Sequence, residues 1–165
     1  MPESMPAIID IEASGFGRGS YPIEVGTVLS DGTPHCYLVR PEPEWTHWDE
    51  SAEQVHGIAR KLIEQRGLPV DEIARRLNAL LGNATVYSDG WGVDRAWLAL
   101  LFEHAGMAQH FTLESVRNLL NEQQTEYWHP TYARVVAELN LSRHRASSDA
   151  MIIQHTLGRV RAHHA

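Results

Sequence analysis

A short apolar run, Ala7–Glu12, carries two acidic residues and limits the possible folds more than any other part of this sequence. The run is rich in isoleucine and is followed by Ser14-Gly15-Phe16-Gly17, which predicts a buried strand that ends in a turn. Because side chains alternate along a strand, Asp10 and Glu12 point to the same face. Two carboxylates on one face of an apolar strand repel each other, so a nearby positive charge is expected.

A divalent cation is one source of that charge. Carboxylate oxygens are ligands that suit Mg²⁺ or Mn²⁺ better than Zn²⁺, which prefers histidine and cysteine. The sequence has 10 histidines, but they are scattered, and the single cysteine, Cys36, offers no zinc-binding spacing. The alternative is that the strand ends near Asp10 and that water alone solvates both acids.

The charge balance excludes some classes of partner. The chain has 14 lysine and arginine residues against 21 aspartate and glutamate residues, a formal net charge of -7, and Lys61 is its only lysine. Tight binding to long duplex DNA or to an anionic membrane depends on clustered basic residues, so neither kind of binding is expected. Cys36 allows no internal disulfide, no apolar run reaches membrane-spanning length and the first residues lack a secretory signal. We therefore expect a soluble cytoplasmic protein.

Hydrophobic patterning predicts strands early in the chain and helices later. After the first strand, 23–29 and 35–39 are typical of a hairpin around Asp31-Gly32, and 84–87 is typical of a fourth strand. Helices are predicted at 50–55, 70–81, 93–104, 131–139 and 147–160, whereas 113–120 is ambiguous. This order predicts an α/β or α+β sandwich whose mixed sheet has the first strand at its centre, within one domain over 1–165 with a core of about 7–160.

Three more polar residues stand at the ends of predicted elements. Asp94 lies at the start of the helix after the fourth strand, where the helix dipole alone also favours an acid. His144 and Asp149, five residues apart, enter the last helix. Each of these features is common by itself, and their order along the chain carries more information.

In that order, these residues resemble the three exonuclease motifs of the DEDDh subgroup of the DnaQ-like 3'-5' exonucleases. The resemblance extends from residue 7 to about residue 157, and it includes Val55-His56-Gly57-Ile58 and the segment 145–150 around Asp149. It implies an α/β architecture, the ribonuclease H-like fold, with a central five-stranded mixed sheet flanked by helices. It also implies that two divalent cations, Mg²⁺ or Mn²⁺, are held by Asp10, Glu12, Asp94 and Asp149, and that His144 is the general base.

The resemblance further implies a substrate-binding region. The turn Ala13-Ser14-Gly15 would hold the terminal 3'-hydroxyl and sugar through its backbone amides and the Ser14 hydroxyl, and His56 would lie by the terminal nucleotide. One departure concerns the second motif, where Asp89-Gly90 stands in place of the His-Asn pair that the family often has. Whether Asp89 adjusts the metal site or only ends the strand stays open.

Several aromatic and basic residues have two interpretations. Trp45, Trp48 and Trp91 are candidates for stacking on unpaired bases, although Trp91 is more simply a packing residue. Trp97 and Trp128 are expected in the core. The exposed arginines Arg18, Arg143 and Arg145 are candidates for phosphate contacts.

The sequence thus predicts a metal-dependent 3'-5' exonuclease that hydrolyses phosphodiester bonds at the free 3' end of single-stranded or short nucleic acid and releases nucleoside 5'-monophosphates. RNA is slightly preferred over DNA as the expected substrate. The alternatives are a non-catalytic nucleic-acid or protein interaction module on the same fold and a metal-dependent phosphatase. No membrane partner is expected. A homodimer is possible, because the apolar helix 93–102 fits either a core or an interface.

Overall fold

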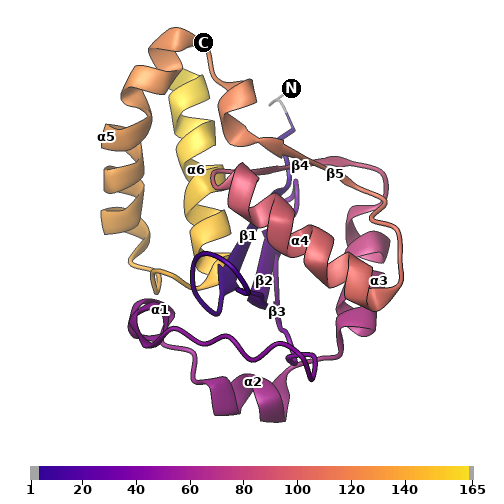
Figure 1. Ribbon diagram of the computed structural model, residues 1–165. Helices are drawn as coiled ribbons and strands as arrows, with labels where there is room; N and C mark the ends of the chain where they lie inside the picture. The colour runs from indigo at the N-terminus through magenta and orange to yellow at the C-terminus, as the bar shows by residue number, and fades with distance from the viewer. Residues whose placement is uncertain (1–3, 164–165) are drawn as a thin grey trace.

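A five-stranded mixed sheet with β1 at its centre organises the molecule, as the computed structural model of residues 4–163 shows (Figure 1). The strands follow the order β3-β2-β1-β4-β5. Strand β2 is antiparallel to β1 and to β3, whereas β4 is parallel to β1 and to β5. The strands are β1 (Ile8–Ala13), β2 (Pro22–Val28), β3 (Pro34–Leu38), β4 (Thr85–Ser88) and β5 (Thr112–Ser115).

Helices cover both faces of this sheet. In chain order, the helices of the molecule are α1 (Glu50–His56), α2 (Arg60–Arg66), α3 (Val70–Leu81), α4 (Trp91–Ala105), the 3-10 helix η1 (Val116–Leu119), α5 (Glu122–Leu139) and α6 (Ala146–His163). Helices α5 and α6 lie side by side, and α6 packs on β1 and β2 (Figure 1). Helices α3 and α4 pack together on the opposite face.

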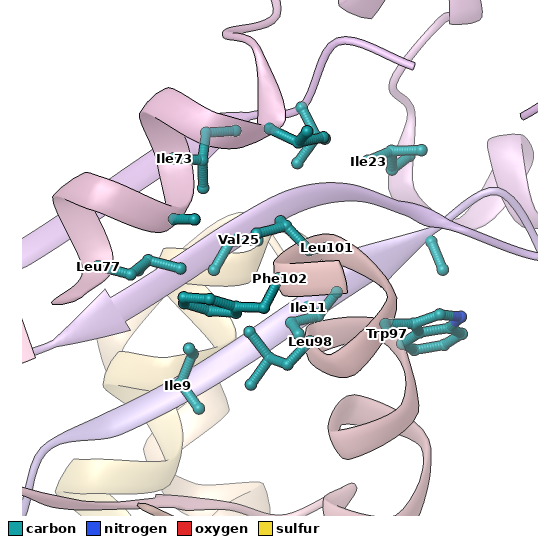
Figure 2. Packing of buried hydrophobic residues seen from close by; sticks show 14 of the residues in the cluster. Ile9, Ile11, Ile23, Val25, Ile73, Leu77, Trp97, Leu98, Leu101 and Phe102 are labelled. Atoms are coloured by element: carbon teal, nitrogen blue, oxygen red, sulfur yellow. The ribbon is translucent and has the colours of Figure 1, made fainter. Parts of the chain in front are cut away.

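The alternation of side chains along β1 divides the core between these two faces. Ile9 and Ile11 point toward α4, where Leu98 and Leu101 are also buried (Figure 2). Ile8 points the other way and packs in a second cluster with residues of α6. Asp10 and Glu12 have the same parity as Ile8, so the strand directs both carboxylates to the α6 side.

The predicted α/β fold, with a mixed sheet and a central first strand, is confirmed. A three-residue turn at 30–32 lies between β2 and β3 as the Asp31-Gly32 signal predicts, with Gly32 at a φ of 87°. The ambiguous segment 113–120 divides into the end of β5 and η1. The sequence left it undecided whether helix 93–102 belongs to the core or to an interface. In the structure most of this helix belongs to the core, with Trp97, Leu98, Leu101 and Phe102 buried.

Two helices differ from the prediction. Helix α2 was not expected, because Ile63 is its only buried residue and one apolar position gives no helical period. Helix α5 begins at Glu122 rather than at residue 131, because Asn121 and Gln124 form a reciprocal capping box at its start. Pro130 therefore lies inside the helix instead of before it.

Within the described part of the chain, 4–163, no helix is both long enough and apolar enough to cross a lipid bilayer.

Candidate metal centre

Five carboxylates gather at the end of β1 in two overlapping groups. In the first triad, Asp10, Glu12 and Asp149 each offer an oxygen atom, and these atoms lie within 4.8 Å of one another. In the second triad, Asp10, Asp89 and Asp94 do the same. Asp10 belongs to both, so the structure brings together all four acids that the sequence predicts as metal ligands and adds Asp89.

The sheet topology explains this convergence. Because β4 runs parallel to β1, both strands end at the same edge, and Asp89 directly follows β4. Asp94 is in the first turn of α4, which begins two residues after Asp89. Asp149 is in the first turn of α6, the helix that covers the face to which Asp10 and Glu12 point.

Burial and mutual repulsion make these carboxylates hard to ionise. The pKa of Asp10 lies well above its ordinary value, first because the group is buried and then because Asp94 and Glu12 are close. Burial, followed by the charge of Asp149, raises the pKa of Glu12 to about 8. Burial raises the pKa of Asp94 to about 7, although the Ser88 hydroxyl donates a hydrogen bond to its carboxylate and opposes this rise. Burial is also the first cause of the raised pKa of Asp149.

The donor set of both triads fits divalent cations. Each triad consists only of carboxylate oxygens, which are the ligands that Mg²⁺ and Mn²⁺ prefer. Among residues 4–163, no side chain or backbone amide donates a hydrogen bond to the Asp10 carboxylate. Arg143 lies at this centre, with its Nε 3.5 Å from Asp149 Oδ1. The charges of Arg145 and Arg117 also act on Glu12 and Asp89. Three arginines cannot balance five acids, so the centre retains an excess of negative charge.

His144 occupies an unusual backbone position at the entrance to α6. Its φ is 60°, in the left-handed region that residues other than glycine seldom adopt. Its backbone N–H donates a 3.1 Å hydrogen bond to Asp149 Oδ1, and its side chain is exposed at the edge of a cavity. The structure therefore places His144 beside the first triad, as the motif predicts.

Glu24 is an acidic residue of this region that sequence reasoning missed. It is fully buried on β2, directly across the sheet from Glu12. Its carboxylate accepts hydrogen bonds from Arg145 Nε and Nη2, the shorter at 2.6 Å, and from the Ala146 backbone N–H at 2.8 Å. Glu24 thus holds the start of α6 in place. An acid inside the apolar run 23–29 is the same signal that identified Asp10, and it could have drawn attention to Glu24.

The backbones of β2 and α6 also touch. A Cβ atom at Gly26 would lie 2.1 Å from the backbone nitrogen of Ser147, which no real side chain can do. Gly26 thereby allows the beginning of α6 to rest directly on the strand. Together with the bonds from Glu24, this contact sets the position of Asp149 and His144 relative to β1.

A first cavity, of about 380 Å³, adjoins the first triad. Glu12 and His144 are among its lining residues, and Phe16 and Val55 lie at its mouth as exposed apolar side chains. Phe16 is the more exposed of the two, at 77% of its surface, and was not singled out from the sequence. Of the residues predicted to bind substrate, Ala13, Gly15 and His56 line this cavity.

The polar groups of Ser14, which the motif places at the terminal sugar, have hydrogen-bond partners within the protein. The residue is fully buried, its hydroxyl accepts a hydrogen bond from the Tyr21 backbone N–H, and it lies 2.9 Å from Nδ1 of His47. Its own backbone N–H donates to the carbonyl of Tyr21. Gly15 is required for close packing, since a Cβ there would lie 2.7 Å from side-chain atoms of His47 and Asp49.

His56 is 5% exposed and is fixed by its neighbours. Its Nδ1 accepts a hydrogen bond from the Ile58 backbone N–H, and its ring packs edge-on against Trp48. Nε2 is buried and has no hydrogen-bond partner among residues 4–163. Burial lowers the pKa of His56, so the ring is neutral at pH 7.

The tryptophans and arginines divide into core, structural and surface positions. Trp45 is 5% exposed and stacks on Tyr21, so it is not available to bases. Trp48 donates a hydrogen bond to Glu53, and Trp91 donates one to the Leu113 carbonyl. Trp97 is buried as predicted, and Trp128 packs against the core on the α6 side. Arg145 is committed to Glu24, whereas Arg18 is exposed and Arg143 lies over the ring of Tyr132.

Comparison with known proteins identifies the fold. The sequence matches no protein-family model and no curated protein. The structure, however, superimposes on Escherichia coli exonuclease I in complex with a dT13 oligonucleotide with a TM-score of 0.73, at 11% identity, over 96% of this chain. The fold is the ribonuclease H-like fold of exonuclease I. This confirms the fold expected from the motifs.

Other structures of exonuclease I give the same result. Exonuclease I of Methylocaldum szegediense matches with a TM-score of 0.69 at 16% identity, over 96% of this chain. A zinc-bound complex of the E. coli enzyme with single-stranded DNA matches with a TM-score of 0.69 at 14% identity. In each case the match covers 41% of the exonuclease I chain, so this chain spans about two-fifths of the length of these proteins.

Proposed function

We propose that this chain is a metal-dependent 3'-5' exonuclease of the DEDDh type, which acts on single-stranded or short nucleic acid and releases nucleoside 5'-monophosphates. The observation that carries the proposal is the pair of carboxylate triads that share Asp10 beside an open cavity. Phosphodiester hydrolysis needs charge neutralisation on both sides of one phosphate, and two adjoining cation sites meet this need. The fold shared with exonuclease I supports the same conclusion.

Asp10, Glu12, Asp94 and Asp149 would hold two divalent cations, Mg²⁺ or Mn²⁺, with Asp89 beside the second. When bound, such cations activate water and stabilise a departing oxyanion. His144 would accept the proton of the attacking water, because its imidazole is exposed at the cavity next to Glu12 and an imidazole nitrogen can act as a general base. The bond from its backbone to Asp149 and the restricted φ fix the position of the His144 backbone at this place.

The first cavity would receive the terminal nucleoside. Phe16 presents an exposed aromatic ring at its mouth, and a base can stack on such a ring. The backbone of Ala13 and Gly15 lines the cavity next to Glu12, where the terminal sugar would lie. His56 closes the inner wall with a neutral ring.

Incubation with 5'-labelled oligonucleotides tests the proposal. DNA and RNA oligomers of one sequence are incubated with Mg²⁺, Mn²⁺ or a chelator, and the products are separated by length. We expect a ladder that shortens from the 3' end with either cation and none with the chelator. Faster shortening of RNA would support the expected preference for RNA.

The control variants are Asp10→Asn, which removes the residue common to both triads, and Asp71→Asn, which changes an exposed acid on α3. Only Asp10→Asn should abolish the ladder. Binding without shortening would instead support an interaction module, and release of inorganic phosphate from nucleoside monophosphates would support a phosphatase. Absence of shortening with both cations would overturn the proposal.

A further inference from the structure

A second cavity, of about 230 Å³, opens at the Asp89 end of the two triads. Its other walls come from η1 and from the first half of α5, and they include Val116, Arg117, Thr125 and Trp128. It shares no lining residue with the first cavity, which adjoins Glu12. Because Asp10 joins the triad of Glu12 to the triad of Asp89, the two cavities lie at different ends of one continuous site.

The walls of this second cavity combine the groups that bind a nucleotide. Arg117 is exposed, and its guanidinium forms no hydrogen bond or ion pair with any residue of the described chain 4–163. Trp128 provides an aromatic ring that packs on the core and also lines the cavity, and Val116 adds an apolar surface. The guanidinium group of arginine donates hydrogen bonds to phosphate oxygens, and aromatic rings stack on bases. The charge of Arg117 acts on Asp89, which lines the same cavity, but its guanidinium N–H groups remain free to donate hydrogen bonds to a ligand.

The chemistry of a phosphodiester explains why a second cavity is needed. The phosphate between two nucleotides has two ester arms, and one arm leads to the terminal nucleoside. If the phosphate lies at the triads and the terminal nucleoside lies in the first cavity, the other arm leaves toward the opposite end of the site. That end is formed by Asp89 and the second cavity.

We propose that the second cavity is a subsite for the nucleotide on the 5' side of the scissile phosphate, with Arg117 in contact with its phosphate and Trp128 in contact with its base. This inference rests on the proposed exonuclease function. It assigns contact with the upstream nucleotide to η1 and α5, so the chain favours an upstream nucleotide over another leaving group on the same phosphate.

Two substrates separate the contributions of the two cavities. The first is a single-stranded trinucleotide with a 5' label. The second is the p-nitrophenyl ester of thymidine 5'-monophosphate, which keeps the terminal nucleoside and the phosphodiester but has p-nitrophenol in place of the upstream nucleotide. For Arg117→Gln we expect the ratio of kcat/KM for the trinucleotide to kcat/KM for the ester to fall about 10-fold, because a hydrogen bond between charged groups is lost. The charge reversal Arg117→Glu should lower this ratio further.

Arg66→Gln is the matched control, because Arg66 is an exposed arginine on α2 that lines neither cavity. Its ratio should equal that of the wild type. If Arg117→Gln leaves the ratio unchanged, or lowers activity on both substrates equally, the subsite is overturned while the exonuclease function stands.

If the wild-type chain hydrolyses neither substrate with Mg²⁺ or Mn²⁺, the proposed function fails. A direct measurement of trinucleotide binding then tests whether the second cavity binds a nucleotide. The readout is then the fluorescence anisotropy of the labelled trinucleotide. Weaker binding by Arg117→Gln than by Arg66→Gln would support a nucleotide contact at the second cavity. Equal binding by the two variants would overturn it.

Discussion

Without a bound cation, the folded chain should lose stability as the pH rises from 6.5 to 8. In the folded chain the pKa of Glu12 is raised from 4.5 to about 8, so the folded state keeps a proton there that the unfolded state has already released. A group that binds more protons in the folded state stabilises it below its folded pKa, and this contribution disappears as the pH approaches that value. This change of stability with pH is opposite in sign to that caused by an ordinary carboxylate in an ion pair, which stabilises the folded state as the pH rises.

The size of the effect follows from the width of this interval. Each pH unit over which one proton is held only by the folded state costs about 1.4 kcal/mol of unfolding free energy. Between pH 6.5 and 8, with Glu12 half titrated at the upper limit, the part of the loss that comes from Glu12 is about 1.5 kcal/mol. For a chain of 165 residues this corresponds to a fall in Tm of roughly 3 to 6 °C.

Thermal unfolding with a chelator, followed by fluorescence in parallel for wild type and Glu12→Gln, measures this loss. The glutamine does not titrate, so its Tm should fall less over the same interval. Asp94, whose pKa is raised by burial to about 7, adds to the loss in both proteins, and His56, whose pKa is lowered by burial, opposes it in both. Added Mg²⁺ or Mn²⁺ should raise the wild-type Tm more at pH 8 than at pH 6.5, because binding requires deprotonated carboxylates. Parallel Tm profiles for the two proteins would refute the reasoning.

Three further substitutions test separate parts of the site. Glu24→Gln leaves Arg145 without its charged partner and should lower the free energy of unfolding, measured by chemical denaturation, by about 3 kcal/mol. An unchanged denaturation midpoint would contradict the conclusion that Glu24 positions α6. Phe16→Ala should raise KM for a single-stranded oligonucleotide about 5-fold in steady-state kinetics and leave Tm unchanged, because the side chain is 77% exposed. His144→Ala should lower kcat by about 100-fold or more at pH 7.5 while Mn²⁺ still raises Tm, and near-normal hydrolysis would exclude it as the base.

Much of the fold could be predicted from the sequence because local signals were strong. The apolar strand 8–13, the turn at Gly32 and the helix end at Gly57 each follow from one or two residue types with a defined geometry. The capping box at Asn121 was also readable, but Pro130 favoured a later start for α5. Helix α2 has too few apolar residues to reveal itself.

The acidic residues of the candidate site could be predicted from the sequence, but the partners of the buried polar groups around them could not. Alternation along a strand placed Asp10 and Glu12 on one face without any knowledge of tertiary structure. The partners of buried groups depend on contacts between distant segments, such as the bond from Arg145 to Glu24 over 121 positions, and no local pattern encodes them. For the same reason, the sequence could not show that the Ser14 hydroxyl is already occupied.

Because of Gly26, strand β2 and helix α6 should be moved together when segments are exchanged between proteins of this fold. The helix can approach the strand only where no side chain intervenes, so an α6 transplanted from another protein of this fold will seat correctly only on a glycine. The acceptor strand must also carry an acid two residues earlier, as Glu24 does here, to receive the incoming arginine. Chimeras should fold when β2 and α6 are moved together or when the acceptor strand carries both residues, and they should fail when it lacks either one.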